Sequence, residues 1–444
     1  MVDTTKKNAS GYKRTEVGLI PIEWDVFKLE DLIEEKKQKN KNKNQHPVYT
    51  ISNVYGFISS DKYFDKQVYS KDLSTYKLIN YDDFAYNPYR VNVGSLALYA
   101  KKTTGLVSSA YVVFKTKGNL SSQYLLFLLK SNKWLNEIMR ASMSRGSVRR
   151  SLSYKDLANF YIPVPPITEQ RTIAHILSTI QQAIEATDRV ITAAQELKKS
   201  LMQHLFTYGP VSLEEAEQVP LKETEMGMIP EHWDISKLSQ AIEEPLFNGL
   251  FVKNPVWGGG TLYLNVADVY KSATVNPVLL KRIHIPEETI LKYSLQDGDI
   301  LFVRSSLKRE GVAKACLVEN IKEPIVFDCH LIRARPNKEL IVPRFFVEYC
   351  RSYKGHNDLI SLSKTTTMTT VPQANISSFK FPLPQLSEQY HIANILNVLD
   401  KKKDVEEKRK NNLQSLFNSM LHHLMTGQLR VKDLDLNIPE EVAQ

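Results

Sequence analysis

The chain of 444 residues carries an internal repeat with a long period, and this repeat constrains its architecture more than any single motif. The segment 15–25 (TEVGLIPIEWD) recurs in register at 224–234 (TEMGMIPEHWD). A Pro-x-Pro-x-x-x-Glu-Gln motif then closes each copy, at 163–170 and at 382–389. Between these landmarks the two copies diverge. This pattern indicates one scaffold that is used twice to recognise two different things.

Each divergent interior is predicted to form a mixed, β-rich α+β domain. Short runs rich in Val, Ile, Phe and Tyr are broken by turn residues, as is typical of strands. Gly298-Asp299 predicts a turn that leads into a strand, whereas the matching place in the first copy, Asp82-Asp83, lacks the glycine. The predicted strands are 46–54, 83–86, 107–115, 261–269, 299–304, 313–318 and 325–334.

A long helix is predicted after each interior, because apolar residues there recur in steps of three and four. We expect the first helix to begin near Glu169 with Thr168 as its N-cap. A helix of about 40 residues is about 60 Å long. The two helices are expected to pack as an antiparallel coiled coil, and the alternative is that each packs only on its own domain. The predicted apolar positions are Ile173, Ile176, Ile180, Ala183, Thr187, Val190, Ala194, Leu197 and Leu201 in the first helix, and Ile392, Ile395, Leu399, Leu413, Leu416 and Met420 in the second.

Charge and composition favour a polyanionic partner and a cytoplasmic location. The formal net charge is +9, and each Lys or Arg placed on a phosphate releases counterions. No apolar run approaches the roughly 20 residues that cross a bilayer, so no membrane contact is expected. The odd count of three cysteines, none in a CxxC pair, indicates neither a disulfide framework nor a structural zinc site.

The motifs of common enzymes do not match this sequence, so we expect no catalytic site and no cofactor of its own. Asn87-Pro88-Tyr89 is similar to the loop with which adenine methyltransferases hold their target, but the second proline is missing and Arg90 follows. There is no GxxxxGK[ST] loop for ATP and no HExxH metal motif.

Basic and hydroxyl-bearing loops occur at matching places in both copies and are the candidate DNA contacts. Such side chains suit phosphate oxygens, and arginine also pairs with guanine edges. For any single residue, an ordinary solvated loop is the competing interpretation. The candidates are Tyr89, Arg90, Arg145, Ser147, Arg149 and Arg150 in the first copy, and Arg304, Ser305, Ser306, Lys308, Arg309, Lys364, Thr365 and Thr366 in the second.

The sequence resembles the specificity subunits of Type I restriction-modification systems along nearly its whole length. The resemblance rests on the duplicated Gly-x-Ile-Pro-x-x-Trp segments, on Ile162 to Gln170 with the helix that follows, and on the Gly298-Asp299-Ile300-Leu301 turn and strand. It implies a first target-recognition domain over 1–160, a spacer helix within 161–210, a second target-recognition domain over 211–384, a second spacer helix within 385–430 and a tail over 431–444.

The resemblance also implies a function and a set of partners. Each target-recognition domain would read one half of a bipartite site in double-stranded DNA. The chain would bind two adenine methyltransferase subunits and two ATP-dependent restriction subunits, which would use S-adenosylmethionine, ATP and magnesium. A stand-alone DNA-binding regulator or defence protein is the main alternative, and a coiled-coil scaffold with merely solubilising loops is a third.

Overall fold

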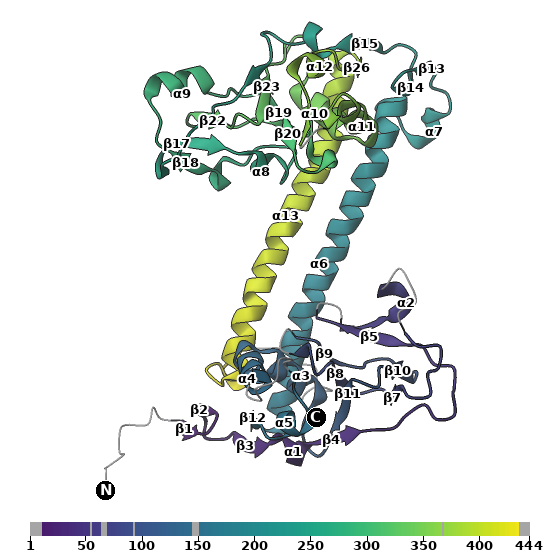
Figure 1. Cartoon of the computed structure of the whole chain (residues 1–444), viewed down its shortest axis with the longest axis vertical. Coiled ribbons are helices and arrows are strands. Elements are labelled where there is room, and N and C mark those ends of the chain that lie inside the picture. The colour runs from purple at the N-terminus through teal and green to yellow at the C-terminus, as the bar shows by residue number, and fades with distance from the viewer. Residues whose placement is uncertain are drawn as a thin grey trace. The chain divides into compact units, whose positions relative to one another are not determined.

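The computed structural model describes residues 11–53, 56–63, 69–91, 94–143, 151–365 and 368–434. The chain forms two compact units. Unit 1 contains residues 1–187 and 409–444, and unit 2 contains residues 188–408. The boundaries fall inside the two long helices, α6 (Ile167–Tyr208) and α13 (Leu386–Met425), so each helix belongs partly to each unit (Figure 1).

The core of unit 1 is built around an antiparallel sheet with the strand order β4-β11-β8-β9. Phe84 on β8 lies opposite Phe114 on β11, and the two buried rings stack with their centroids 4.8 Å apart. The elements of unit 1 before α6 are β1 (Tyr12–Thr15), β2 (Gly18–Pro21), β3 (Asp25–Lys28), α1 (Leu29–Leu32), β4 (Ile33–Lys36), β5 (Tyr49–Ser52), β6 (Gly56–Ser59), α2 (Ser60–Tyr63), β7 (Lys77–Ile79), β8 (Asp83–Tyr86), β9 (Leu96–Leu98), β10 (Gly105–Val107), β11 (Val112–Thr116), α3 (Ser122–Lys130), α4 (Asn132–Met143), α5 (Tyr154–Ala158) and β12 (Tyr161–Val164).

Unit 2 repeats this plan with the sheet β16-β23-β19-β21, and helix α10 packs against β21 and α11 (Figure 1). Its elements between α6 and α13 are α7 (Leu213–Ala216), β13 (Leu221–Thr224), β14 (Gly227–Pro230), β15 (Asp234–Lys237), η2 (Leu238–Gln240), β16 (Phe247–Asn248), β17 (Trp257–Leu264), α8 (Val266–Val269), η3 (Pro277–Leu279), β18 (Lys281–Ile283), α9 (Glu287–Tyr293), β19 (Ile300–Val303), β20 (Ser305–Ser306), η4 (Arg309–Gly311), β21 (Ala315–Leu317), β22 (Ile325–Phe327), β23 (Leu331–Ala334), α10 (Pro343–Arg351), α11 (Tyr353–Ser361), β24 (Lys364–Thr365), β25 (Thr369–Thr370), α12 (Gln373–Ser377) and β26 (Lys380–Leu383). The short η5 (Val431–Asp433) follows α13.

The central strands β8 and β19 begin at the same turn although only one copy has the glycine. Gly298 has a φ of 98° and Asp82 a φ of 67°, so both take the left-handed conformation. Asp is one of the few residues with a side chain that tolerates this region. The carboxylate of Asp83 then accepts a hydrogen bond from the backbone N–H of Asn80 at 2.9 Å, which closes the turn before the strand.

The repeated glutamine anchors the start of each long helix to its domain. The Gln170 side chain accepts a hydrogen bond from the backbone N–H of Ser121, and Gln389 accepts one from Val342, both at 2.8 Å. The Gln170 amide also donates to the Pro165 carbonyl oxygen at 2.9 Å. Both glutamine side chains are buried, so these bonds satisfy polar groups that would otherwise be costly to bury.

The repeated Trp and Glu form a second anchor in each unit. The indole N–H of Trp24 donates to Glu169 at 2.9 Å, and Trp233 donates to Glu388 at 3.2 Å. In unit 1, Glu169 also pairs with Arg430, which follows α13 in the chain, at 2.8 Å. The duplicated motifs are therefore contacts that fix the same tertiary frame twice.

Each hydrophobic core combines the start of one long helix with the end of the other. Each long helix therefore packs on both domains, so neither helix packs only on the domain that precedes it. The contributing side chains are Ile173 and Leu177 of α6 with Leu424 and Met425 of α13 in unit 1, and Leu205 and Phe206 of α6 with Ile392 and Leu396 of α13 in unit 2.

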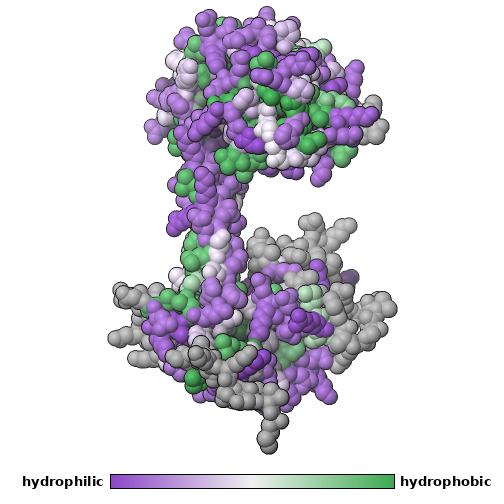
Figure 2. Space-filling view, turned by 90° about the vertical axis from the view of Figure 1, so that its left-hand side faces the viewer, coloured by the Kyte–Doolittle hydropathy of each residue, from purple (hydrophilic) through white to green (hydrophobic). Residues whose placement is uncertain are grey.

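Two details of the predicted helix are wrong. Helix α6 begins at Ile167, and Thr168 lies inside it, so Thr168 is not the N-cap. Val190 and Leu197 are exposed, whereas Ile191 is buried and Lys198 is partly buried. In this part of the helix the side chain of Lys198 turns inward and forms an ion pair with Glu348. On the face shown in Figure 2, the long helices carry mostly hydrophilic residues.

Three predicted strands are interrupted. Residues 107–115 divide between β10 and β11, and residues 261–269 end β17 at Leu264 and then form α8. Residues 325–334 divide into β22 and β23 around a turn at 328–330. A continuous apolar pattern does not reveal a short turn when the residues on both sides of it are buried. Within the described ranges, no helix has the length and apolar character that a membrane span requires.

Candidate DNA interface

The candidate residues of unit 2 come together in a small three-stranded sheet. After β19 the chain enters β20, which pairs with β25, and β25 pairs with β24. Ser305 lies opposite Thr370, and Lys364 lies opposite Thr370 on the other side. The structure thus places Ser305–Ser306 and Lys364–Thr365, two segments about 60 residues apart in the sequence, in one small sheet on either side of β25.

Lys308 and Arg309 follow β20 and lead into η4. The hydroxyl oxygen of Ser306 accepts a hydrogen bond from the backbone N–H of Lys308 at 3.2 Å, which turns the chain outward. Both cationic residues are exposed, as are Lys364 and Thr365. Long cationic side chains in this position are suited to phosphate oxygens.

The corresponding loop in unit 1 follows β8 and carries Tyr89 and Arg90, which are both exposed. The side-chain oxygen of Asn87 accepts the backbone N–H of Tyr89 at 3.1 Å, so this amide builds a turn. That bond gives Asn87 a structural role in this turn.

The two loops occupy equivalent places in the two units. The backbone N–H of Leu152 donates to the Pro88 carbonyl oxygen at 3.0 Å, and Val371 donates to Arg304 at 2.9 Å. In each unit, the loop after the central strand therefore bonds to the segment that follows the other candidate loop, which is residues 145–150 in unit 1 and 364–366 in unit 2. The remaining candidates, Arg145, Ser147, Arg149, Arg150 and Thr366, lie outside the described residues.

A pocket opens beside the small sheet of unit 2, and the sequence did not indicate it. Tyr270 closes one side, where its hydroxyl donates to the Gly311 carbonyl oxygen at 3.1 Å. His330 contributes from the turn between β22 and β23. The lining residues are Val266, Tyr270, Ser305, Ser306, Leu307, Lys308, Glu310, Gly311, His330 and Met368. A histidine in a turn between two buried strands could have indicated this pocket, but the prediction of one strand over 325–334 hid the turn.

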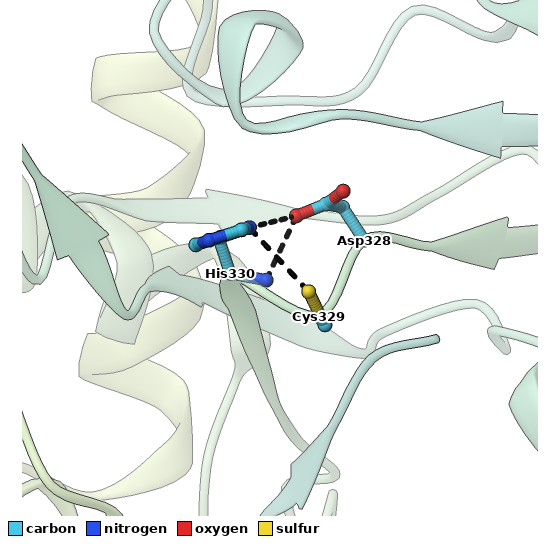
Figure 3. Close-up of side chains that lie close together, drawn as sticks. All are labelled: Asp328, Cys329 and His330. Atoms are coloured by element: carbon cyan, nitrogen blue, oxygen red, sulfur yellow. Dashed lines mark hydrogen bonds and ion pairs between the residues drawn. The ribbon is translucent and has the colours of Figure 1, made fainter. Parts of the chain in front are cut away.

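Asp328, Cys329 and His330 bring three potential metal ligands within 4.8 Å of one another in this turn (Figure 3). Hydrogen bonds account for their proximity without an ion, because Asp328 accepts from the His330 ring at 2.8 Å and from Tyr263 at 2.6 Å. Burial, together with the charge of Asp328, raises the pKa of Cys329. A raised pKa leaves less thiolate, so the Cys329 sulfur is a weaker nucleophile than that of an unperturbed cysteine.

The duplicated frame and its paired loops define a class of two-domain DNA-recognition proteins, and comparison with known families agrees. The family of the Type I restriction modification DNA specificity domain matches residues 21–194 and 230–415. This match covers most of the chain, and the chain belongs to this family.

Individual relatives match over long stretches. The Type I restriction enzyme MjaVIII specificity subunit of Methanocaldococcus jannaschii is 26% identical, over 94% of this chain and 95% of its own length. The Type I restriction enzyme EcoKI specificity subunit of Escherichia coli is also 26% identical, over 69% of this chain and 66% of its own length. The crystal structure of a Type I restriction-modification S subunit from M. genitalium shares the fold, with a TM-score of 0.58 at 15% identity over 90% of this chain and 96% of that one.

Proposed function

We propose that this chain reads a bipartite DNA site, one half-site with each unit, and directs adenine methylation or restriction by partner subunits. The partners would be two adenine methyltransferase subunits and two ATP-dependent restriction subunits. S-adenosylmethionine, ATP and magnesium would be bound by these partners, and this chain would contribute recognition and no catalytic group.

One observation carries the proposal: the loops leave the central strands at equivalent places in the two units, while their backbone conformations and the side chains that they display differ. The matching hydrogen bonds of Leu152 and Val371 align Pro88 with Arg304; beyond this point residues 89–90 continue a turn, whereas residues 305–306 form β20. A repeated frame with different exposed side chains is what two readers of different sequences require, because base edges are distinguished by the donors, acceptors and apolar groups that face them.

The arrangement of charge agrees with this role. The chain has a net charge of +9, and Lys308, Arg309 and Lys364 are exposed around the small sheet of unit 2. Contacts to phosphate give affinity and position, whereas contacts to bases give specificity. Cationic residues around polar and aromatic ones supply both kinds of contact.

The test is a genome-wide map of methylated adenines in host cells with and without this chain. We expect a split motif with a fixed unread gap that disappears on deletion. A map that does not change while the partner methyltransferase is expressed would contradict the proposal and favour a stand-alone DNA-binding protein.

A further inference from the structure

Two residues of unit 2, Asp328 and Tyr263, hold the ring of His330 in one orientation. The hydroxyl of Tyr263 donates to one carboxylate oxygen of Asp328 at 2.6 Å. The other carboxylate oxygen accepts from the backbone N–H of His330 and from its ring Nδ1, both at 2.8 Å (Figure 3). A carboxylate accepts only, so Nδ1 carries the proton, and in the neutral ring Nε2 is an acceptor.

The ring so oriented lies at the candidate DNA interface. The backbone N–H of Arg304 donates to the carbonyl oxygen of His330 at 2.7 Å, which joins the turn to the start of the small sheet. His330 lines the pocket together with Ser305, Ser306 and Lys308. Its side chain is 51% exposed, and no described residue forms a hydrogen bond with Nε2.

Unit 1 contains the same turn without the histidine. The backbone N–H of Ala110 donates to the hydroxyl oxygen of Ser108 at 3.3 Å, as His330 donates to Asp328. The closing bond of the turn is also conserved, since Tyr111 donates to the Ser108 carbonyl oxygen at 3.0 Å and Leu331 donates to that of Asp328 at 2.9 Å. The turn therefore requires an oxygen at its first position and does not require an imidazole at its third.

We propose that His330 is a specificity-determining contact of unit 2, with Asp328 and Tyr263 as its positioning residues. This proposal rests on the proposed function and names one reader within it. Nε2 accepts a hydrogen bond from an exocyclic amino group, the N6 of adenine or the N4 of cytosine, which are the donors in the major groove. A phosphate oxygen is the wrong partner for an acceptor, and the neighbouring Lys308 serves phosphates instead.

The experiment uses His330→Ala in the full chain, expressed with its partner subunits, and maps methylated adenines across the genome. We expect one position in one half-site to become degenerate, with discrimination lowered about 10- to 100-fold, the range of a good base contact. The other half-site and the gap stay unchanged, and they show in the same sample that the chain is folded and assembled.

Two further variants sharpen the result. Asp328→Ser reproduces the turn of unit 1 while releasing the ring, and it should weaken discrimination at the same position by a smaller factor. His284→Ala, at an exposed histidine of unit 2 that does not line the pocket, should leave the site unchanged.

An unchanged motif in His330→Ala, or a uniform loss of methylation without a relaxed base, would overturn the proposal. Failure of the proposed function has a different signature. In that case the wild-type chain itself directs no split motif, which the comparison with the deletion strain decides before any variant is made.

Discussion

A buried ion pair in unit 2 gives a quantitative test of how the long helices are held. Glu348 on α10 is fully buried, and Lys198 on α6 lies 2.9 Å from its carboxylate. Lys198 also pairs with Asp400 on α13 at 2.7 Å, and Arg344 pairs with Asp400 at 3.0 Å. One lysine therefore joins three helices, and one of its two anions, Glu348, has no access to water.

Replacing Lys198 by Met removes the charge and keeps most of the side-chain volume. Glu348 then retains only Arg344, whose Nε lies 3.7 Å away. Removing one partner of a buried pair leaves a charge without compensation and typically costs about 3–5 kcal/mol. We expect unit 2 to lose stability in this range near neutral pH.

The loss should depend on pH with a definite sign. Burial raises the pKa of Glu348, and the charge of Lys198 opposes that rise. Without Lys198 the folded-state pKa rises further, so the folded variant takes up a proton more readily than its unfolded chain. The destabilisation is then largest above the folded pKa and becomes smaller as the pH falls towards the usual carboxyl range.

Hydrogen exchange followed by mass spectrometry measures the effect in each unit separately. Peptides from α10 should exchange at least a hundredfold faster in Lys198→Met, because about 3 kcal/mol corresponds to that factor. Peptides from α3, the counterpart in unit 1, serve as the internal control. A change of less than tenfold in α10, or an equal change in α3, would refute the reasoning.

Unit 1 supplies a matched replacement for the whole pair. At the equivalent positions, Phe127 on α3 and Phe417 on α13 make an edge-to-face contact with their ring centroids 6.0 Å apart. The double variant Lys198→Phe/Glu348→Phe should recover most of the protection of α10, because well-packed apolar residues often replace a buried ion pair without loss. A double variant that is as unstable as Lys198→Met would show that Arg344 and Asp400 also depend on the pair.

Three further outcomes can be measured. Gly427→Ala should destabilise the end of α13 by about 2 kcal/mol or more, because Gly427 has a positive φ and a Cβ there would also meet Pro21. Gly118→Ala, at a glycine with a positive φ but with open space around it, should cost only about 1 kcal/mol. Hydrogen exchange of the last turn of α13 and of the β11–α3 segment measures the two effects. Arg304→Ala should weaken binding of the assembled complex to its cognate duplex by about 1–3 kcal/mol if the guanidinium reads a base, and unchanged fluorescence anisotropy titrations would argue against that contact. Burial lowers the pKa of His356, so the stability that the neutral ring contributes is fully present above the usual histidine pKa and is lost as the pH falls below it. His356→Gln should therefore flatten the pH dependence of hydrogen exchange in α11 between about pH 7.5 and 5.5, and equal slopes in both proteins would contradict this.

The sequence predicts those parts of the structure that depend on local pattern or on repetition. The two long helices, the strand at 83–86 and the equivalence of the two copies follow from periodicity and from the duplicated motifs. The sequence leaves the turn at Asp82 open, because the glycine is missing there, and the structure shows that Asp takes the same positive φ. These features require no knowledge of contacts between distant residues.

Other parts could not be predicted, because they depend on tertiary contacts that leave no periodic trace. Nothing in the local sequence shows that Arg430 pairs with Glu169, or that Tyr12 donates to the carbonyl oxygen of Gly427 at 2.9 Å. In the candidate site, the loops after the central strands were predicted, but the turn that presents His330 was not. The bond from Tyr263 to Asp328 forms only when β17 is paired with β22, so the local sequence does not show it.

The two copies differ both at exposed positions in turns and at buried positions where helices pack, and the two kinds of position change under different constraints. In the turn before β11 or β23, Ser108 with Ala110 and Asp328 with His330 give the same backbone bonds, so the exposed side chain can change alone. Inside the units the change has to be made in pairs, since a phenylalanine such as Phe417 beside Glu348 would leave the buried carboxylate without the lysine that compensates its charge. An exchange of domains between chains of this family should therefore succeed when α10 or α3 is transferred together with the helix end that packs on it. It should fail when only one member of the pair is transferred, because the cost of an unpaired buried charge, about 3–5 kcal/mol, is a large part of the stability of a typical domain.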